Sequence, residues 1–183
     1  MKTILFFFVS FNIISTAFAQ QSIYNPFRLD LAIGLAFPTG NTFLDQRFSF
    51  SAEPKYNLSD QFTLGLKIEI DPNSDFAGTS EPYIINSVSS YLLTGDYFFN
   101  KAKNIRPFFG IGAGLFRQTI SGSGFPTTKI KSEKPGLETR LGLERKRFRV
   151  AVEYNATLFK EEKKMNFVTL KLGTFLWGGY KKK

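Results

Sequence analysis

Eight segments of this chain alternate between apolar and polar side chains with a period of two residues, and no other feature restricts its fold as strongly. Successive side chains of a β-strand point to opposite faces, so each segment is predicted to be a strand with one apolar and one polar face. A tilted strand needs about 9 to 11 residues to cross a bilayer, and the segments are near this length. The segments are 28–37, 47–58, 61–70, 91–99, 106–115, 135–144, 148–156 and 168–176.

The connections between these segments are sorted by length. The segments 59–60, 100–104 and 145–146 are short, whereas 38–46, 71–86, 118–134 and 157–167 are longer. Short turns at one end, together with both termini, and longer loops at the other are typical of outer-membrane barrels. We therefore predict an all-β fold, a closed eight-stranded antiparallel up-and-down transmembrane β-barrel. Pro54 has no N–H to donate, so we expect a bulge or an early strand end there.

The polar face of the predicted strands carries nearly balanced charge, with seven acids and six bases, whereas the strand centres of the apolar face carry none. Several glycines share the charged face, as expected where side chains crowd inside a narrow barrel. We therefore expect the charged face to line the interior and the apolar face to contact lipid. Alternation alone also permits the reverse arrangement, a soluble periplasmic lipocalin-like barrel. The charged residues are Arg28, Asp30, Glu53, Lys55, Lys67, Glu69, Asp96, Glu138, Arg140, Glu144, Arg149, Glu153 and Lys171.

Aromatic residues make up 16% of the chain, which contains 22 Phe. On the apolar face they gather near strand ends, where membrane interfaces favour rings that tolerate the headgroup layer. Beyond the N-terminal segment, we expect Phe largely on lipid-facing strands and in these belts. The predicted interface aromatics are Tyr56, Phe62, Tyr97, Phe99, Phe109 and Phe148 at the short-turn end, and Phe37 and Phe48 at the other.

The N-terminal segment 1–19 has a basic start at Lys2, an apolar run, and small residues at Ala17 and Ala19. This layout predicts a secretory signal peptide. The predicted organisation is therefore a signal peptide at 1–19, a lead-in at 20–27, the barrel at 28–178 and a basic tail at 179–183. No later stretch is apolar enough for a transmembrane helix.

The chain has no Cys and no His, which removes thiolate chemistry and the commonest general base and metal ligand. We therefore predict no enzymatic activity, no catalytic residues, no metal and no cofactor. The interior charges are interpreted as a salt-bridged plug, because an eight-stranded barrel is just wide enough to be filled by side chains. A narrow pore or a small-ligand-binding barrel is the alternative. The glycines of 110–114 lie mid-strand with no following helix, which argues against a phosphate loop.

The formal net charge of +9 is assigned to turns, loops and the tail, because the predicted interior is close to neutral. Lys129, Lys131, Lys163 and Lys164 in the longer loops are candidates for contacts with lipopolysaccharide headgroups, and plain solvated hairpin tips are the alternative. Membrane lipid is the expected partner. The bases form no single patch, so nucleic acid is not expected. The barrel is predicted to be a monomer.

Three stretches, 51–66, 106–115 and 142–155, resemble the eight-stranded outer-membrane barrels of the OmpX and OmpA transmembrane-domain type. The resemblance covers the chain after 19 and is greatest to the small "outer membrane protein beta-barrel domain" proteins of Bacteroidota. It implies a Gram-negative outer membrane, assembly by the barrel-assembly machinery, and a structural, surface-interaction or envelope-integrity role. It carries over no catalytic residue. One departure is the C-terminus, which ends on three Lys where many such barrels end on an aromatic residue.

Overall fold

The computed structural model describes residues 23–39, 46–72, 84–100, 104–122, 130–158 and 166–179. The expected signal peptide at 1–19 and the tail lysines Lys181 to Lys183 lie outside the described residues, as do the loop residues Lys129, Lys163 and Lys164. Lys131 belongs to a described strand, but its side chain is not described.

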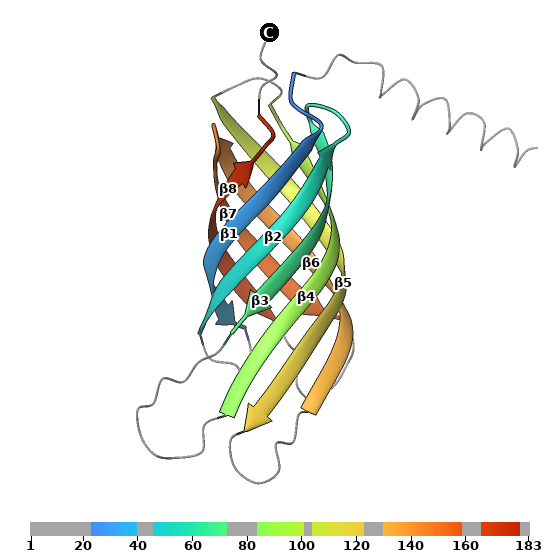
Figure 1. Cartoon of the computed structure of the whole chain (residues 1–183), viewed down its shortest axis with the longest axis vertical. Coiled ribbons are helices and arrows are strands. Elements are labelled where there is room, and N and C mark those ends of the chain that lie inside the picture. The colour runs from blue at the N-terminus through green and yellow to red at the C-terminus, as the bar shows by residue number, and fades with distance from the viewer. Residues whose placement is uncertain are drawn as a thin grey trace, which may run out of the picture.

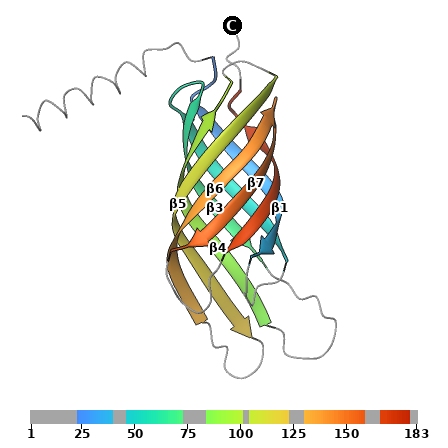
Figure 2. The ribbon, with the colours of Figure 1, turned by 180° about the vertical axis from the view of Figure 1, so that it is seen from behind.

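Eight antiparallel strands follow one another around a closed barrel, in which each strand pairs with the next and the last pairs with the first (Figures 1 and 2). This architecture confirms the predicted fold class. Within the described residues, no helix is long and apolar enough to span a membrane. The strands are β1 (Phe27–Pro38), β2 (Arg47–Asn57), β3 (Phe62–Asp71), β4 (Ile84–Phe98), β5 (Ile105–Gly122), β6 (Ile130–Arg145), β7 (Phe148–Thr157) and β8 (Phe167–Leu176).

The two ends of the barrel differ in their connections. The segments 58–61, 99–104 and 146–147 join strands at the end where β1 begins and β8 ends, here called the turn end (Figure 1). The connections 39–46, 72–83, 123–129 and 158–166 belong to the opposite end, the loop end. At the turn end the backbone N–H of Asn25 donates to the carbonyl of Gly179 at 2.9 Å, which ties the two ends of the barrel chain together.

Three strands extend further toward the loop end than the alternation predicts. Strand β4 begins at Ile84, β5 runs to Gly122 and β6 begins at Ile130, so the predicted loops 71–86 and 118–134 are partly strand (Figure 1). The outward positions of these extensions include Arg117 and Glu133, which form an exposed ion pair. Because polar residues occupy the outer face there, the apolar alternation that marks the rest of each strand is missing.

Pro54 neither bulges β2 nor ends it, so that expectation is wrong. Residues 50–52 and 55–57 of β2 pair with β3 in one unbroken register, from Phe50 with Ile70 to Asn57 with Thr63. The register with β3 omits only Glu53 and Pro54, while Pro54 still pairs with Leu29 of β1. The missing N–H of Pro54 therefore removes its pairing with β3 but not with β1. The residue pairs on either side keep the register.

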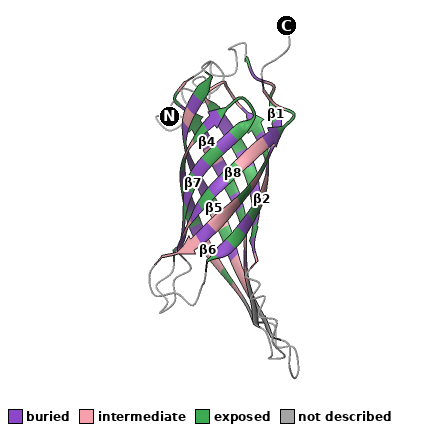
Figure 3. Ribbon diagram, turned by 90° about the vertical axis from the view of Figure 1, so that its left-hand side faces the viewer, coloured by how far each residue is buried: buried purple, intermediate pink, exposed green. Residues whose placement is uncertain are grey.

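Buried and exposed residues alternate along the strands (Figure 3), but in the opposite sense to a water-soluble barrel, whose apolar side chains would be the buried ones. Large apolar side chains point outward and are exposed, including Leu66 (61%), Leu93 (62%) and Leu141 (60%). Charged side chains point inward and are buried, including Lys67 and Arg140 (both 2%). The interior, called the lumen below, is thus polar at its centre, and the outer wall is apolar.

Candidate functional site

The lumen contains all thirteen charged residues that the alternation places on the polar face, each of them buried. It also contains three that the sequence analysis omitted, Arg47, Asp71 and Arg106, at exposures of 1% to 5%. They lie at or near strand ends, but they occupy the same inward positions of the alternation, which was the signal that could have found them. With them the buried charges of the described residues balance, at eight bases and eight acids.

Arg140 of β6 crosses the middle of the lumen. Its guanidinium donates to Glu53 of β2 at 2.7 and 3.0 Å and to Asp96 of β4 at 2.7 Å. Gly110 makes room for it, since a Cβ at that position would lie 2.6 Å from Nε of Arg140. Lys55 of β2 reaches the same carboxylates, at 2.7 Å from Asp96 and 3.1 Å from Glu53. Each charge therefore has several partners, as burial requires.

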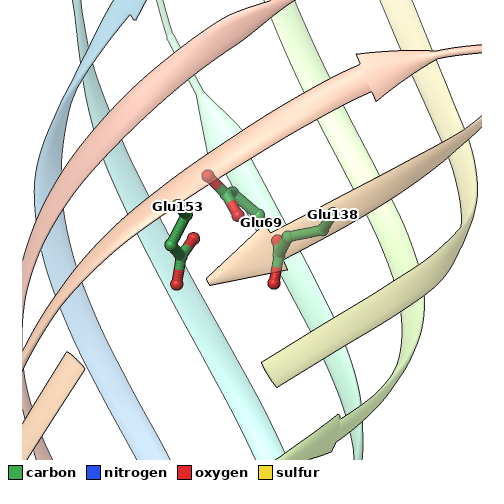
Figure 4. Close-up of side chains that lie close together, drawn as sticks. All are labelled: Glu69, Glu138 and Glu153. Carbon is green, nitrogen blue, oxygen red and sulfur yellow. The ribbon is translucent and has the colours of Figure 1, made fainter. Parts of the chain in front are cut away.

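Three glutamates gather around one ammonium on the loop side of Arg140. Nζ of Lys67 lies 2.6 Å from Glu69, 2.5 Å from Glu138 and 2.5 Å from Glu153. Figure 4 shows the three carboxylates facing one another, and their oxygens lie close enough to hold a metal ion. Lys67 already supplies the positive charge at the point where these carboxylates converge, and Lys171 adds a second one at 2.8 Å from Glu69.

Each of these glutamates has a short polar residue directly across from it on the next strand. Glu69 pairs with Ser90, Glu138 with Asn155, and Glu153 with Thr169. Those three side chains are at most 2% exposed, and their polar atoms have no hydrogen-bond partner among the described residues. The glutamate cluster is therefore flanked by neutral polar groups on the neighbouring strands.

Aromatic rings close the charged interior at the turn end. Arg149 stacks over Phe108 at 3.7 Å, and Arg106 lies between Phe98 at 4.0 Å and Tyr24 at 4.1 Å. Each arginine also reaches a carboxylate, for example Glu144 at 3.0 Å from Arg106. The planar guanidinium can stack and donate hydrogen bonds at the same time, which an ammonium cannot do.

Apolar side chains occupy the lumen at the loop end as well. Phe116 and Phe167 contact each other edge to face at 6.2 Å, in a buried cluster with Val88 and Leu92. Among the described residues, five Phe are thus inside the barrel, whereas seven other Phe are exposed, so the expected place on lipid-facing strands and belts holds for most of them but not for these five. They are Phe98, Phe108, Phe116, Phe167 and Phe175.

Little space remains between the charged side chains. A cavity of about 20 Å³ lies among Asp30, Glu53, Arg140, Arg149 and Lys171. This is room for about one water molecule. Among the described residues, the lumen is therefore packed by side chains, and its charges neutralise one another in ion pairs.

The outer wall ends in exposed aromatic rings. Seven of the eight predicted interface aromatics are at least 40% exposed, from Phe109 (40%) to Phe48 and Phe148 (both 65%), and Phe37 is half-buried. Two further exposed rings lie outside the predicted set: Phe27, which is 68% exposed and packs against Tyr56 at 5.2 Å, and Trp177, which is 74% exposed. Both lie at the turn end.

Three solved outer-membrane barrels resemble this structure. Neisserial surface protein A has a TM-score of 0.67 at 15% identity, over 84% of this chain and 98% of that one. Ail, the attachment invasion locus protein of Yersinia pestis, has a TM-score of 0.54 at 13% identity, over 85% and 100%. The N-terminal β-barrel domain of Pseudomonas aeruginosa OprF has 0.51 at 16%, over 86% and 100%.

The chain shares their fold. All three are small eight-stranded outer-membrane barrels of the OmpA and OmpX type. No family model and no curated protein matches the sequence. At identities this low the likeness concerns architecture alone, and the role of the barrel has to come from its own residues.

Proposed function

We propose that this chain is an integral, non-enzymatic protein of a Gram-negative outer membrane, with a role in surface interaction or envelope integrity. Its segment 1–19 directs export, the barrel-assembly machinery inserts it, and it works as a monomer. The packed lumen makes the barrel a rigid carrier for the loops at the loop end. Catalysis and transport are not part of this role.

The reversed polarity of the barrel carries the proposal. A water-soluble barrel would place its apolar residues inside, yet here leucines such as Leu66 and Leu93 are more than half exposed around the wall. Soluble monomers rarely expose a continuous apolar surface larger than a few hundred Å². Lipid is the environment in which such a wall is stable, and this argues against a lipocalin-like periplasmic barrel.

Extraction of the protein from cells tests the membrane assignment. The expected result is that detergent releases the protein while salt and alkali do not, and that the folded barrel migrates differently on gels before and after boiling. Release into the aqueous phase by alkali alone would overturn the assignment and favour the soluble alternative.

Conductance in planar bilayers tests the filled lumen against the pore alternative. The expected result is no single-channel conductance from the wild-type protein, because Arg140 and its partners block the middle of the barrel. Steady conductance that disappears when Arg140 or Lys67 is replaced would show that these charges line a working path, and the plug would have to be abandoned.

Lipopolysaccharide is the proposed partner of the loop-end lysines. A related structure shows Ail in complex with the heparin analogue sucrose octasulfate, a polyanionic sugar. For this chain the proposed residues are Lys129, Lys131, Lys163 and Lys164, whose side chains lie outside the described residues. The test compares binding of the wild type and the four-fold Lys→Gln variant to bilayers with and without lipopolysaccharide. Equal binding would contradict this contact.

A further inference from the structure

Three consecutive bases form the tight turn between β6 and β7. The side chains of Arg145, Lys146 and Arg147 are all exposed, and none of them forms an ion pair with a carboxylate of the described residues. Lys146 has a left-handed backbone with φ of 55°, so the turn is fixed in a tight shape that holds the three bases together. These are unneutralised charges at the turn end, in contrast to the paired charges of the lumen.

In the sequence, most of the net positive charge belongs to segments that connect, end or follow the strands at this end. Connections and flanks at the turn end contain eight bases in the sequence and one acid, Asp60. Asp60 already accepts from the backbone N–H of Ile23 at 2.8 Å. The loop-end connections and strand extensions contain seven bases and six acids, so that end is nearly neutral. The eight bases are Lys101, Lys103, Arg145, Lys146, Arg147, Lys181, Lys182 and Lys183.

The three described bases adjoin the exposed aromatic belt. Arg145 pairs directly with Phe148, whose ring is 65% exposed on the outer wall. The carbonyl of Arg147 accepts from the N–H of Phe175 at 3.2 Å, two residues before Trp177. Exposed rings at a barrel rim lie at headgroup depth in a bilayer. The bases next to them therefore lie where lipid phosphates would be.

We propose that the turn-end rim formed by Arg145, Lys146, Arg147 and Trp177 binds anionic phospholipid headgroups of the adjacent leaflet. The inference rests on the proposed membrane location and adds a lipid class and a binding surface to it. An anionic leaflet attracts each Lys or Arg near its surface, and the attraction falls off within a Debye length. The rim thus selects anionic over zwitterionic phospholipid and fixes the depth of the barrel.

Continuity with the lipid-facing wall favours a phospholipid over an acidic protein. Phe148 and Trp177 are exposed beside the bases, and a lipid satisfies both features at once, its chains against the rings and its phosphate against the guanidinium and ammonium groups. An acidic soluble partner would leave the rings unexplained.

Trp177 is the only tryptophan of the chain, so its fluorescence reports on the rim directly. The experiment reconstitutes the full protein into bilayers that contain brominated phosphatidylglycerol or brominated phosphatidylcholine in otherwise equal mixtures. The expected result at low salt is that the phosphatidylglycerol quenches roughly two- to fivefold more strongly per molecule, and that high salt reduces the difference.

The test variant is R145Q/K146Q/R147Q, which removes three charges from an exposed turn. It is expected to lose most of the lipid preference while the quenching by brominated phosphatidylcholine stays the same. The matched control is R117Q/K134Q/K160Q, which removes three bases from the loop-end side of the barrel, outside the proposed lipopolysaccharide contacts, and should keep the preference. Equal quenching by the two lipids in the wild type, or an unchanged preference in R145Q/K146Q/R147Q, would overturn the inference.

The same quenching experiment distinguishes a failure of the membrane assignment from a failure of the lipid selectivity. If the protein does not insert, neither brominated lipid quenches Trp177, and the proposed function fails. If brominated phosphatidylcholine quenches Trp177 but phosphatidylglycerol has no advantage, the protein is in the membrane and only the lipid selectivity is wrong. Binding of a soluble acidic protein that abolishes the lipid preference would likewise count against a lipid partner.

Discussion

Arg140 and Glu53 join opposite walls of the barrel, because their strands, β6 and β2, are four apart in a closed ring of eight and the two side chains meet at 2.7 Å. Lys67 and Glu153 do the same between β3 and β7 at 2.5 Å. These pairs connect opposite walls across the interior. The backbone hydrogen bonds of the wall do not need them, so the interior side chains make a separate contribution to the structure.

Replacing Arg140 with Met is expected to destabilise the barrel strongly. The substitution leaves Glu53 and Asp96 short of a buried partner, and breaking a buried ion pair typically costs about 3 to 5 kcal/mol. Denaturant unfolding in detergent or lipid, followed by gel migration, measures this change. The control is R117M, which removes the exposed pair with Glu133 and should cost no more than about 1 kcal/mol. Equal effects of the two variants would show that the central pair is not a brace.

Replacing Gly114 with Ala is expected to cost about 1 to 3 kcal/mol by overpacking. A Cβ there would collide with the backbone carbonyl of Tyr91 and lie 2.9 Å from Cα of Leu92, and a paired strand cannot move away. The control is G95A on the outer wall, where the nearest atom to a new Cβ is 3.7 Å away. G95A should be neutral or slightly stabilising in the same unfolding measurement. A reversed order would mean that inward and outward faces are assigned wrongly.

Replacing Pro54 with Val should restore pairing between β2 and β3 without changing the register. The variant gains an N–H at the position where the pairing with β3 is interrupted, so a new hydrogen bond of about 0.5 to 1.5 kcal/mol is expected, partly offset by the greater freedom of the unfolded chain. Amide hydrogen exchange should show slow exchange at residue 54. Fast exchange there, with all neighbours protected, would mean that the gap has a cause other than the missing N–H.

Replacing Arg106 with Lys should cost roughly 1 to 3 kcal/mol although the charge is kept. Arg106 stacks between Phe98 and Tyr24 while donating to Glu144, and an ammonium cannot reproduce that geometry. R145K in the exposed turn is the matched control and should have no measurable effect on unfolding. If R106K unfolds like the wild type, the stacking contributes little and charge alone closes the turn end.

The alternation in the sequence predicts most of the wall because lipid and lumen impose opposite requirements on neighbouring residues. Beyond the apolar wall these requirements no longer apply, and the alternation no longer predicts the strands there. Strand β5 continues past Leu115, but its outward positions, such as Arg117, are polar, so nothing in the pattern marks it as a strand.

The lumen charges were predictable from the same alternation of inward and outward positions. Arg47 and Asp71 were missed only because they occupy strand ends. Phe98 and Phe108 were harder to place, since an aromatic ring is compatible with the wall, the belt and the interior. Only the three-dimensional packing shows that these rings cover arginines. The ion-pair partners were also beyond the sequence, because the distance between opposite walls depends on barrel closure.

The cross-wall pairs also determine how this protein can be made. Arg149 of β7 pairs with Asp30 of β1 and Asp96 of β4, and among the described residues no carboxylate of its own half forms an ion pair with it, so the second half of the chain leaves this charge unpaired. A half-built sheet in a bilayer would hold unpaired charges against hydrocarbon, which is too costly to persist. Closure is therefore expected to be all-or-none, with no long-lived partial barrel.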